Sequence, residues 1–483
     1  MMNIDTFSSV TDMLAALRTR QISAVELLDI HLAQIERHNG ELNAIVIPNY
    51  DEARRCAVAA DEARARGEEQ PLLGLPLTVK DCLYMQGLPT TGGLPERAQA
   101  IAEVDSAVVA RLRNAGSVIL GKTNVPPYAA DWQSDNPLFG RTNNPWNLAH
   151  TPGGSTGGGA AAVAAGLTPL EFGGDFGGSI RIPAAFCGIY GHKSSETALP
   201  RSGHFPGLPS PNAATAMAVQ GPLARSAQDL MVAFDVVAGP DVGEATGWQL
   251  ALPAARHKRL ADFRVAVLPT VDWLPVDAEI MAAQETLAGQ LRQLGAKVAY
   301  IQPAVFGDLR DYAKLYLSIF YAISTIGMPE DERRREAQEL RALGDELLMA
   351  YADALEGSIG DYMIWFGQRE FYRAALREFF QEWDILLAPA NIVNAFPHTT
   401  VPMPLRQLEV NGEAVRYNLQ FVYASLCNLS GHPGTAFPVG MSQNGLPIGL
   451  QAIGPYLEDY TPMRFAELVA QELGGYQRPP HYR

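Results

Sequence analysis

Apolar residues recur at helical spacing in the first part of the chain. Within the first 66 residues they repeat every three or four positions after Ser23, and Ser23 with Glu26 forms a capping-box pattern. Residues 51–66 begin with acidic and end with basic side chains, which suits the dipole of a helix. We expect both segments to be helices that contribute packing and no chemistry.

Strand spacing begins at residue 75 and then alternates with helical spacing. Alternating apolar positions over residues 75–79 predict a short strand that carries Lys80 and Asp81 at its end. Residues 262–302 show strand, helix and strand patterns in turn, which is typical of a βαβ unit. The same reasoning predicts helices at 105–115 and 461–473, a strand end and helix over 221–239, mostly helix over 306–382, strands at 117–121, 383–389, 434–440 and 446–453, and an exposed turn at 410–412 in an irregular stretch.

Residues 122–154 form a long segment that is rich in Pro and Asn and has little periodicity. A loop of this length inside a compact domain is usually functional or ordered against something. Its aromatic residues are expected mostly to pack the loop onto the core. Ala129 and Trp132 are candidates for a pocket wall, which we expect to come from residues 125–136, Phe176 and the variable region 306–420.

Composition and charge restrict the class of protein. The 483 residues carry a net charge of −15, which argues against nucleic acid or an anionic membrane as the main partner. The N-terminus shows no secretory signal, and no stretch approaches 18 consecutive apolar residues. The four cysteines lack metal-site spacing and are expected to be free thiols in a reducing compartment, so we expect a cytoplasmic protein.

The most unusual stretch is residues 153–183, in which ten of thirty-one residues are glycine. Such a density makes sense where backbone N–H groups must approach a reacting group closely. A linker is disfavoured by the apolar run 160–167, and a phosphate loop by the absence of a GxxxxGK[ST] pattern. Ser155 and Ser179 lie beside the glycine clusters, so a serine-hydrolase centre is the favoured hypothesis.

A serine nucleophile needs a base. Of the nine histidines, His150 and His192 flank the serine segment and His432 lies in an SGHPG loop near the C-terminus. None belongs to a GxSxG arrangement followed by a spaced Asp and His, so a Ser-His-Asp triad is disfavoured. Lysine can serve when burial keeps it neutral, and Lys80 is the only lysine predicted at the end of a hydrophobic strand. Asp81 would oppose this effect if its carboxylate pointed inward.

These residues suggest a Ser-Lys arrangement. Ser155 would bridge Lys80 and Ser179, and the N–H groups of residues 176–179 (Phe176, Gly177, Gly178 and Ser179) would form an oxyanion hole.

The chain resembles the amidase signature family. The resemblance rests on GLPLTVKD (74–81), GRTNNPWN (140–147), PGGSTGG (152–158) and GGDFGGSIRIPA (173–184), with less specific matches at 221–230 and 429–454. It implies Ser179 as nucleophile, Lys80 as base and Ser155 as the bridging serine after a cis peptide bond from Gly154. It also implies one α/β domain over residues 1–483, with a mixed, twisted central sheet covered by helices on both sides, in place of the two to four domains that length alone suggests.

Within that domain we expect an N-terminal helical part and a catalytic core, followed by the βαβ unit, a variable pocket region and a C-terminal part. Their ranges are 1–66, 71–240, 262–302, 306–420 and 421–483.

Two residues depart from the family pattern. Thr156 and Phe176 stand where the family usually has small residues. The Phe176 ring is expected to pack at the loop, with a reshaped acyl pocket as the alternative. By the same resemblance Asp175 and Arg181 brace the loop, and a substrate-binding role for Arg181 is the alternative.

The expected activity is hydrolysis of a small-molecule carboxylic amide, and also of aryl esters or carbamates, without cofactor or metal. Rival interpretations are an A-type subunit of a glutaminyl-tRNA amidotransferase, a membrane-bound fatty acid amide hydrolase and a non-catalytic binding protein on the same scaffold. The acidic charge disfavours the first, the lack of an anchor the second, and the intact Lys80, Ser155 and Ser179 the third. The substrate and the oligomeric state stay open, with a homodimer as one option.

Overall fold

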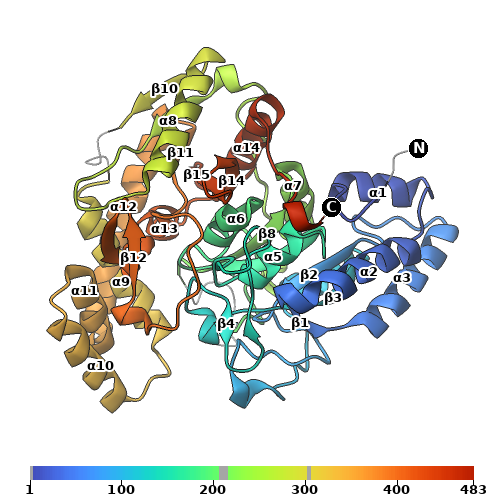
Figure 1. The fold of residues 1–483 in the computed structure, drawn as a ribbon, viewed down its shortest axis with the longest axis horizontal. Coiled ribbons are helices and arrows are strands. Elements are labelled where there is room, and N and C mark those ends of the chain that lie inside the picture. Colours follow the sequence, from blue (N-terminus) through green and yellow to red (C-terminus); the bar gives the residue numbers. More distant parts are fainter. Residues whose placement is uncertain (1–3, 206–215, 302–305, 483) are drawn as a thin grey trace.

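A mixed sheet of eleven strands forms the centre of the computed structural model, which describes residues 4–205, 216–301 and 306–482 (Figure 1). The strand order is β1-β3-β2-β6-β8-β7-β14-β15-β11-β9-β10. The strands are β1 Ile45–Pro48, β2 Pro76–Lys80, β3 Val118–Thr123, β6 Leu170–Asp175, β7 Tyr190–Lys193, β8 Val219–Ala224, β9 Arg264–Val267, β10 Lys297–Tyr300, β11 Ile385–Pro389, β14 Gly434–Met441 and β15 Pro447–Ile453. Two small hairpins lie outside this sheet, β4 Asp135–Asn136 with β5 Gly140–Arg141, and β12 Gln407–Val410 with β13 Glu413–Arg416.

The strand directions are mixed in a way that places the signature segments next to one another. β2 runs parallel to both β3 and β6, so the ends of these strands lie at one edge. The middle of the sheet, from β6 to β11, is antiparallel. At the far side of the sheet, β9 runs parallel to β10 and to β11. The helix α8 Ala278–Gln293 connects β9 to β10, which confirms the predicted βαβ unit.

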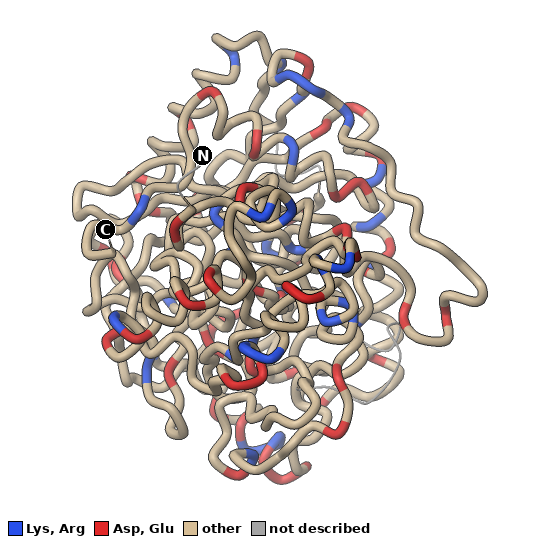
Figure 2. The backbone as a smooth tube through the Cα atoms, turned by 90° about the vertical axis from the view of Figure 1, so that its right-hand side faces the viewer, with Lys and Arg blue, Asp and Glu red and all other residues tan. Residues whose placement is uncertain are grey.

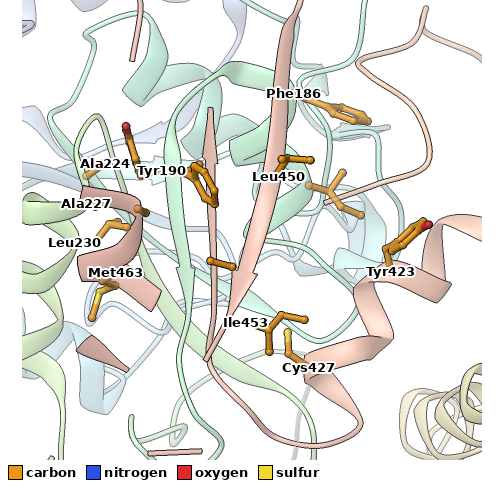
Figure 3. Packing of buried hydrophobic residues seen from close by; sticks show 14 of the residues in the cluster. Phe186, Tyr190, Ala224, Ala227, Leu230, Tyr423, Cys427, Leu450, Ile453 and Met463 are labelled. Atoms are coloured by element: carbon orange, nitrogen blue, oxygen red, sulfur yellow. The ribbon is translucent and has the colours of Figure 1, made fainter. Parts of the chain in front are cut away.

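Helices cover both faces of the sheet. Adjacent residues of a strand point to opposite faces, and in β8 Leu223 packs with α5 and α6, whereas Ala224 belongs to the larger cluster with Leu230 of α7. Figure 3 shows Leu230 and Met463 of α14 on one side of the central strands and Phe186 of α6 on the other. The remaining helices are α1 Val10–Arg18, α2 Ala24–Leu42, α3 Tyr50–Ala65, α4 Ala107–Asn114, α5 Gly157–Ala164, α6 Arg181–Cys187, α7 Ala227–Val237, α9 Leu309–Ser324, α10 Glu330–Ala342, α11 Glu346–Glu356, α12 Ile359–Glu382, α13 Gln420–Asn428 and α14 Tyr460–Leu473.

The structure corrects two of the predicted segments. The first 66 residues are not all helical, because β1 lies between α2 and α3 and pairs with β3. The stretch around the 410–412 turn is not irregular, because that turn joins β12 to β13. The capping box at Ser23 is present as predicted. All four cysteines are free, and among the described residues no helix has both the length and the apolar character needed to cross a membrane.

Candidate active site

The end of β2 delivers Lys80 to the glycine-rich segment. Every residue of β2 is buried, and the Lys80 side chain is only 1% exposed. Its Nζ lies 2.7 Å from Ser155 Oγ and 3.4 Å from the carbonyl oxygen of Gly174. Burial lowers the pKa of Lys80, against the opposing effects of Cys82, Asp175 and Glu171. Burial therefore makes the neutral, proton-accepting form of this amine easier to reach than it is in water.

Asp81 does not act as a counter-ion of Lys80. Its carboxylate lies 2.7 Å from Lys122 Nζ and also accepts a hydrogen bond from the Thr91 hydroxyl. The sequence alone did not show which way the Asp81 carboxylate points, and the structure shows that it pairs with Lys122. Burial can lower the pKa of Lys80 because the neighbouring acid is already paired.

The expectation that Lys80 is the only lysine at the end of a hydrophobic strand is wrong. Lys122 in β3 and Lys193 at the end of β7 are also fully buried. Lys122 is bound to Asp81, and Lys193 donates to the carbonyl oxygens of Ser194 and His432. Contact with Ser155, and not strand-end burial, distinguishes Lys80.

The cis peptide bond implied by the family resemblance is present between Gly154 and Ser155. A Cβ on Gly154 would lie 2.4 Å from the carbonyl oxygen of Asp131, so only glycine fits there. The N–H of Thr156, the next residue, donates to the Ser179 carbonyl over 3.1 Å. This bond joins the segment of Ser155, the candidate bridging serine, directly to that of Ser179, the candidate nucleophile.

The Thr156 side chain occupies the space next to Gly173, where a larger residue than glycine would place its Cβ. Its side chain is fully buried, and a Cβ on Gly173 of β6 would lie 2.6 Å from the Thr156 methyl group. Threonine in place of the family's small residue is therefore accommodated by packing against β6.

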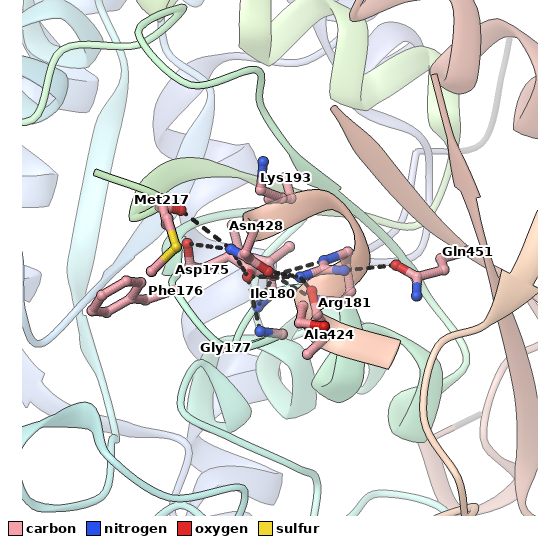
Figure 4. A network of polar contacts seen from close by, with 12 residues as sticks. Asp175, Phe176, Gly177, Ile180, Arg181, Lys193, Met217, Ala424, Asn428 and Gln451 are labelled. Carbon is pink, nitrogen blue, oxygen red and sulfur yellow. Dashed lines mark hydrogen bonds and ion pairs between the residues drawn. The ribbon is translucent and has the colours of Figure 1, made fainter. Parts of the chain in front are cut away.

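Asp175 and Arg181 brace the loop of residues 176–180, which we call the nucleophile loop because it carries the candidate nucleophile Ser179. The Asp175 carboxylate accepts the N–H groups of Gly178 (2.9 Å) and Ile180 (3.1 Å), and Arg181 pairs with it at 3.0 Å (Figure 4). Burial opposes the ionised form of Asp175, but the charge and hydrogen bonds of Arg181 hold its pKa down to about 2.

The guanidinium of Arg181 is occupied on every side. It contacts the side chains of Gln451 (2.6 Å) and Asn428 and the carbonyl oxygen of Ala424, and it is 1% exposed. These contacts support the bracing role over the substrate-binding alternative.

The four predicted oxyanion donors divide into two groups. The prediction that the Gly178 N–H contributes to the oxyanion hole is wrong, because this N–H donates to Asp175 and is not available to a substrate. For the N–H groups of Phe176, Gly177 and Ser179 the described residues provide no acceptor. The nucleophile candidate, Ser179, is 9% exposed. An oxyanion hole in this loop would therefore use the N–H groups of Phe176, Gly177 and Ser179, and not that of Gly178.

The predicted pocket residues have different surroundings. Phe176 is half-buried, and its ring packs against Phe320 of α9 with centroids 4.4 Å apart. Trp132 is buried, and its indole N–H donates to the Gly177 carbonyl over 2.9 Å, so it holds the nucleophile loop by a hydrogen bond. Ala129 lies half-exposed in a short 3-10 turn, Pro127–Ala129.

Sequence reasoning missed three residues that hold the loop. Gln451 and Asn428 bind Arg181, and the Tyr316 hydroxyl donates to the Phe176 carbonyl over 2.7 Å. Gln451 lies inside the less specific matching stretch 429–454, which is a signal that could have identified it. Tyr316 lies in the variable region, where spacing alone gives no such signal.

Comparison with known proteins places the chain in a family. A model of the Amidase family matches residues 26–462. The A-type subunit of the glutamyl-tRNA(Gln) amidotransferase of Chromohalobacter salexigens is 32% identical, covering 98% of both chains. The indoleacetamide hydrolase of Bradyrhizobium diazoefficiens is also 32% identical, over 93% of this chain and 84% of its own. The crystal structure of a bacterial aryl acylamidase of the amidase signature family, 28% identical, aligns with a TM-score of 0.81 over 96% of each chain.

Proposed function

The chain belongs to the amidase family, and on that premise we propose that it hydrolyses a carboxylic amide through a seryl acyl-enzyme. The observation that carries the proposal is the 2.7 Å contact between Lys80 Nζ and Ser155 Oγ in a buried site. A neutral amine next to a hydroxyl can accept its proton, and a serine can pass on a proton that it receives.

In the acylation half-reaction Ser179 Oγ attacks the carbonyl carbon of the amide. Its proton passes to Ser155, whose own proton passes to Lys80. The carbonyl oxygen becomes an oxyanion, which accepts hydrogen bonds from free backbone N–H groups of the loop. When the C–N bond breaks, Ser155 gives a proton to the departing amine and regains one from the Lys80 ammonium. Lys80 is then neutral again.

Deacylation uses the same groups. A water molecule gives its proton through Ser155 to Lys80 and attacks the acyl carbon. The tetrahedral intermediate collapses, the acid leaves, and Ser179 recovers its proton by the reverse relay. An ester or carbamate can acylate Ser179 in the same way, because the first step requires only an acyl carbon and a leaving group.

An aryl amide is the substrate class to test first. Two of the three similar proteins reported above, an indoleacetamide hydrolase and an aryl acylamidase, have names that refer to aromatic compounds. The half-buried Phe176 ring beside the candidate nucleophile, packed against Phe320, suits an aromatic group as well.

Hydrolysis of a panel of short aliphatic, long-chain and aryl amides tests the proposal. The wild-type chain should release amine, and Ser179→Ala should reduce the rate by at least about 10³-fold. Ser117→Ala is a matched control, because this buried serine donates to the Leu112 carbonyl and should be dispensable. Wild-type-like hydrolysis by folded Ser179→Ala would refute the assignment.

An amidotransferase A-type subunit is the second candidate, favoured by the 32% identity to such a protein over nearly the whole chain. Against it, the net charge is −15, and Figure 2 shows Lys and Arg positions interspersed with Asp and Glu and not gathered into one stretch. Hydrolysis of aryl amides by the chain alone, with no reaction of L-glutamine, would favour the amidase. Glutamine hydrolysis only with partner subunits would favour the amidotransferase.

A further inference from the structure

The nucleophile loop consists of peptide units whose carbonyl ends are individually held. In a trans peptide the C=O and N–H point in opposite directions, and the only cis bond in the described chain is Gly154–Ser155. A hydrogen bond to a loop carbonyl therefore fixes where the N–H of the following residue points.

Two of the units present a free N–H. The Gly178 carbonyl accepts the Ile182 N–H at 2.8 Å, which orients the N–H of Ser179. The Phe176 carbonyl accepts the Tyr316 hydroxyl at 2.7 Å, which orients the N–H of Gly177. No acceptor among the described residues occupies either N–H.

The peptide unit between these two, which joins Gly177 to Gly178, is hydrogen-bonded through both its carbonyl and its N–H. The Gly177 carbonyl accepts the Trp132 indole N–H at 2.9 Å, and the Gly178 N–H donates to Asp175. Its orientation is fixed, but it offers nothing to a substrate.

We propose that Tyr316 is a positioning residue for the oxyanion hole, and that its hydroxyl aims the Gly177 N–H at the oxygen of the group attached to Ser179. The inference rests on the proposed function, in which Ser179 is the nucleophile. Ile182 is held in the first turn of α6, whereas Tyr316 comes from α9, outside the signature segments. A hydrogen bond to the carbonyl also polarises the peptide and strengthens its N–H as a donor.

The surroundings of Tyr316 suit this role. The side chain is fully buried, and burial, aided by the charge of Asp175, raises its pKa well above the ordinary value, so the hydroxyl keeps its proton. A Cβ on Gly177 would lie 3.1 Å from both Tyr316 Oη and the ring of Phe421. Glycine at this position lets α9 and α13 approach the loop closely.

α9 also supplies a matched control. Tyr312 lies one helical turn before Tyr316 and is equally buried. Its hydroxyl donates to the Leu426 carbonyl at 2.7 Å, in α13 and not in the nucleophile loop. Tyr312→Phe therefore removes the same group from the same helix without touching the loop.

The test is the rate at which phenylmethanesulfonyl fluoride modifies Ser179, with the site verified by peptide mass mapping. This reaction needs no knowledge of the natural substrate, and its sulfonyl oxygens need the same N–H donors. Tyr316→Phe should slow modification about 10-fold, a part of the 10²–10³-fold lost when an oxyanion donor is removed. Tyr312→Phe should stay within about twofold of wild type, and thermal melting should show both variants folded.

Equal rates for Tyr316→Phe and Tyr312→Phe would overturn the inference. Failure of wild-type Ser179 to react would overturn both the inference and the nucleophile assignment. Modification of Ser179 without hydrolysis of any amide would refute only the proposed activity, and the comparison of rates would still decide the role of Tyr316. With a cleaved substrate, Tyr316→Phe should lower kcat and kcat/KM equally, because the contact acts in the transition state.

Discussion

Lys122 Nζ lies 2.7 Å from a carboxylate oxygen of Asp81, and both side chains are buried. Asp81 directly follows Lys80, so an unpaired carboxylate here would favour a charged Lys80. The pair removes this obstacle by satisfying the acid with a different lysine from the neighbouring parallel strand β3. Lys122 thus helps to keep the pKa of Lys80, the lysine assigned to catalysis, below its ordinary value.

Breaking this pair should be costly. Lys122→Met or Asp81→Asn leaves one buried polar group without its partner, with an expected loss of about 3–5 kcal/mol of unfolding free energy. The double variant should lose clearly less than the sum of the two, as measured by urea unfolding. Additive losses would show that the two side chains do not interact in the folded state.

Activity should depend on the protonation of Lys80. Burial lowers its pKa, so the neutral form that accepts the proton is present above that lowered pKa and is lost as the pH falls through it. We expect kcat/KM to rise with pH and then level off. Lys80→Met should lose about 10²–10⁴-fold in rate together with this acid limb. An unchanged acid limb in Lys80→Met would assign it to another group.

Asp175 should matter for both stability and rate, whereas an equally buried carboxylate elsewhere should matter for stability alone. Asp175→Asn turns an amide donor toward N–H groups that need an acceptor, so we expect a loss of about 3–5 kcal/mol and at least a tenfold fall in kcat. Asp384, bound to Arg256 and Arg264, is the matched control, and Asp384→Asn should destabilise while kcat stays within about twofold.

The same two carboxyls should contribute to acid sensitivity. Burial raises the pKa of each, but arginine contacts outweigh this and hold it near 2, below the ordinary value of 3.8. Their stabilisation is present above pH 3.8 and is lost as the pH falls toward 2. Each Asn variant should therefore show a shallower loss of stability between about pH 4 and pH 2. A slope equal to that of wild type would contradict the lowered pKa values.

The sequence indicated the candidate reacting groups more fully than the residues that support them. The long glycine-rich motif and the strand end at Lys80 are local features, and the fold class followed from the family resemblance and the alternating patterns. The direction of Asp81, the occupied N–H of Gly178 and the contact of Tyr316 with Phe176 depend on residues far apart in the chain. Periodicity reports which face a residue occupies, and it carries no information about such pairs.

Thr156 and Gly173 should behave as a complementary pair. Gly173→Ala places a methyl group 2.6 Å from the Thr156 methyl, so we expect a loss of about 1–3 kcal/mol from overpacking. Thr156→Ala should restore most of this loss in the double variant, because it removes the clashing methyl. Thermal unfolding of the four proteins measures the coupling, and a double variant no more stable than Gly173→Ala would exclude this packing account.

The most direct test of the account is peptide mass mapping after phenylmethanesulfonyl fluoride treatment of wild type and Lys80→Met. We expect one sulfonyl group per chain, on Ser179, in wild type, and modification at least about 10²-fold slower in folded Lys80→Met. An unmodified Ser179 in folded wild-type protein, or equal rates in the two proteins, would contradict the assignment of a lysine-activated serine nucleophile.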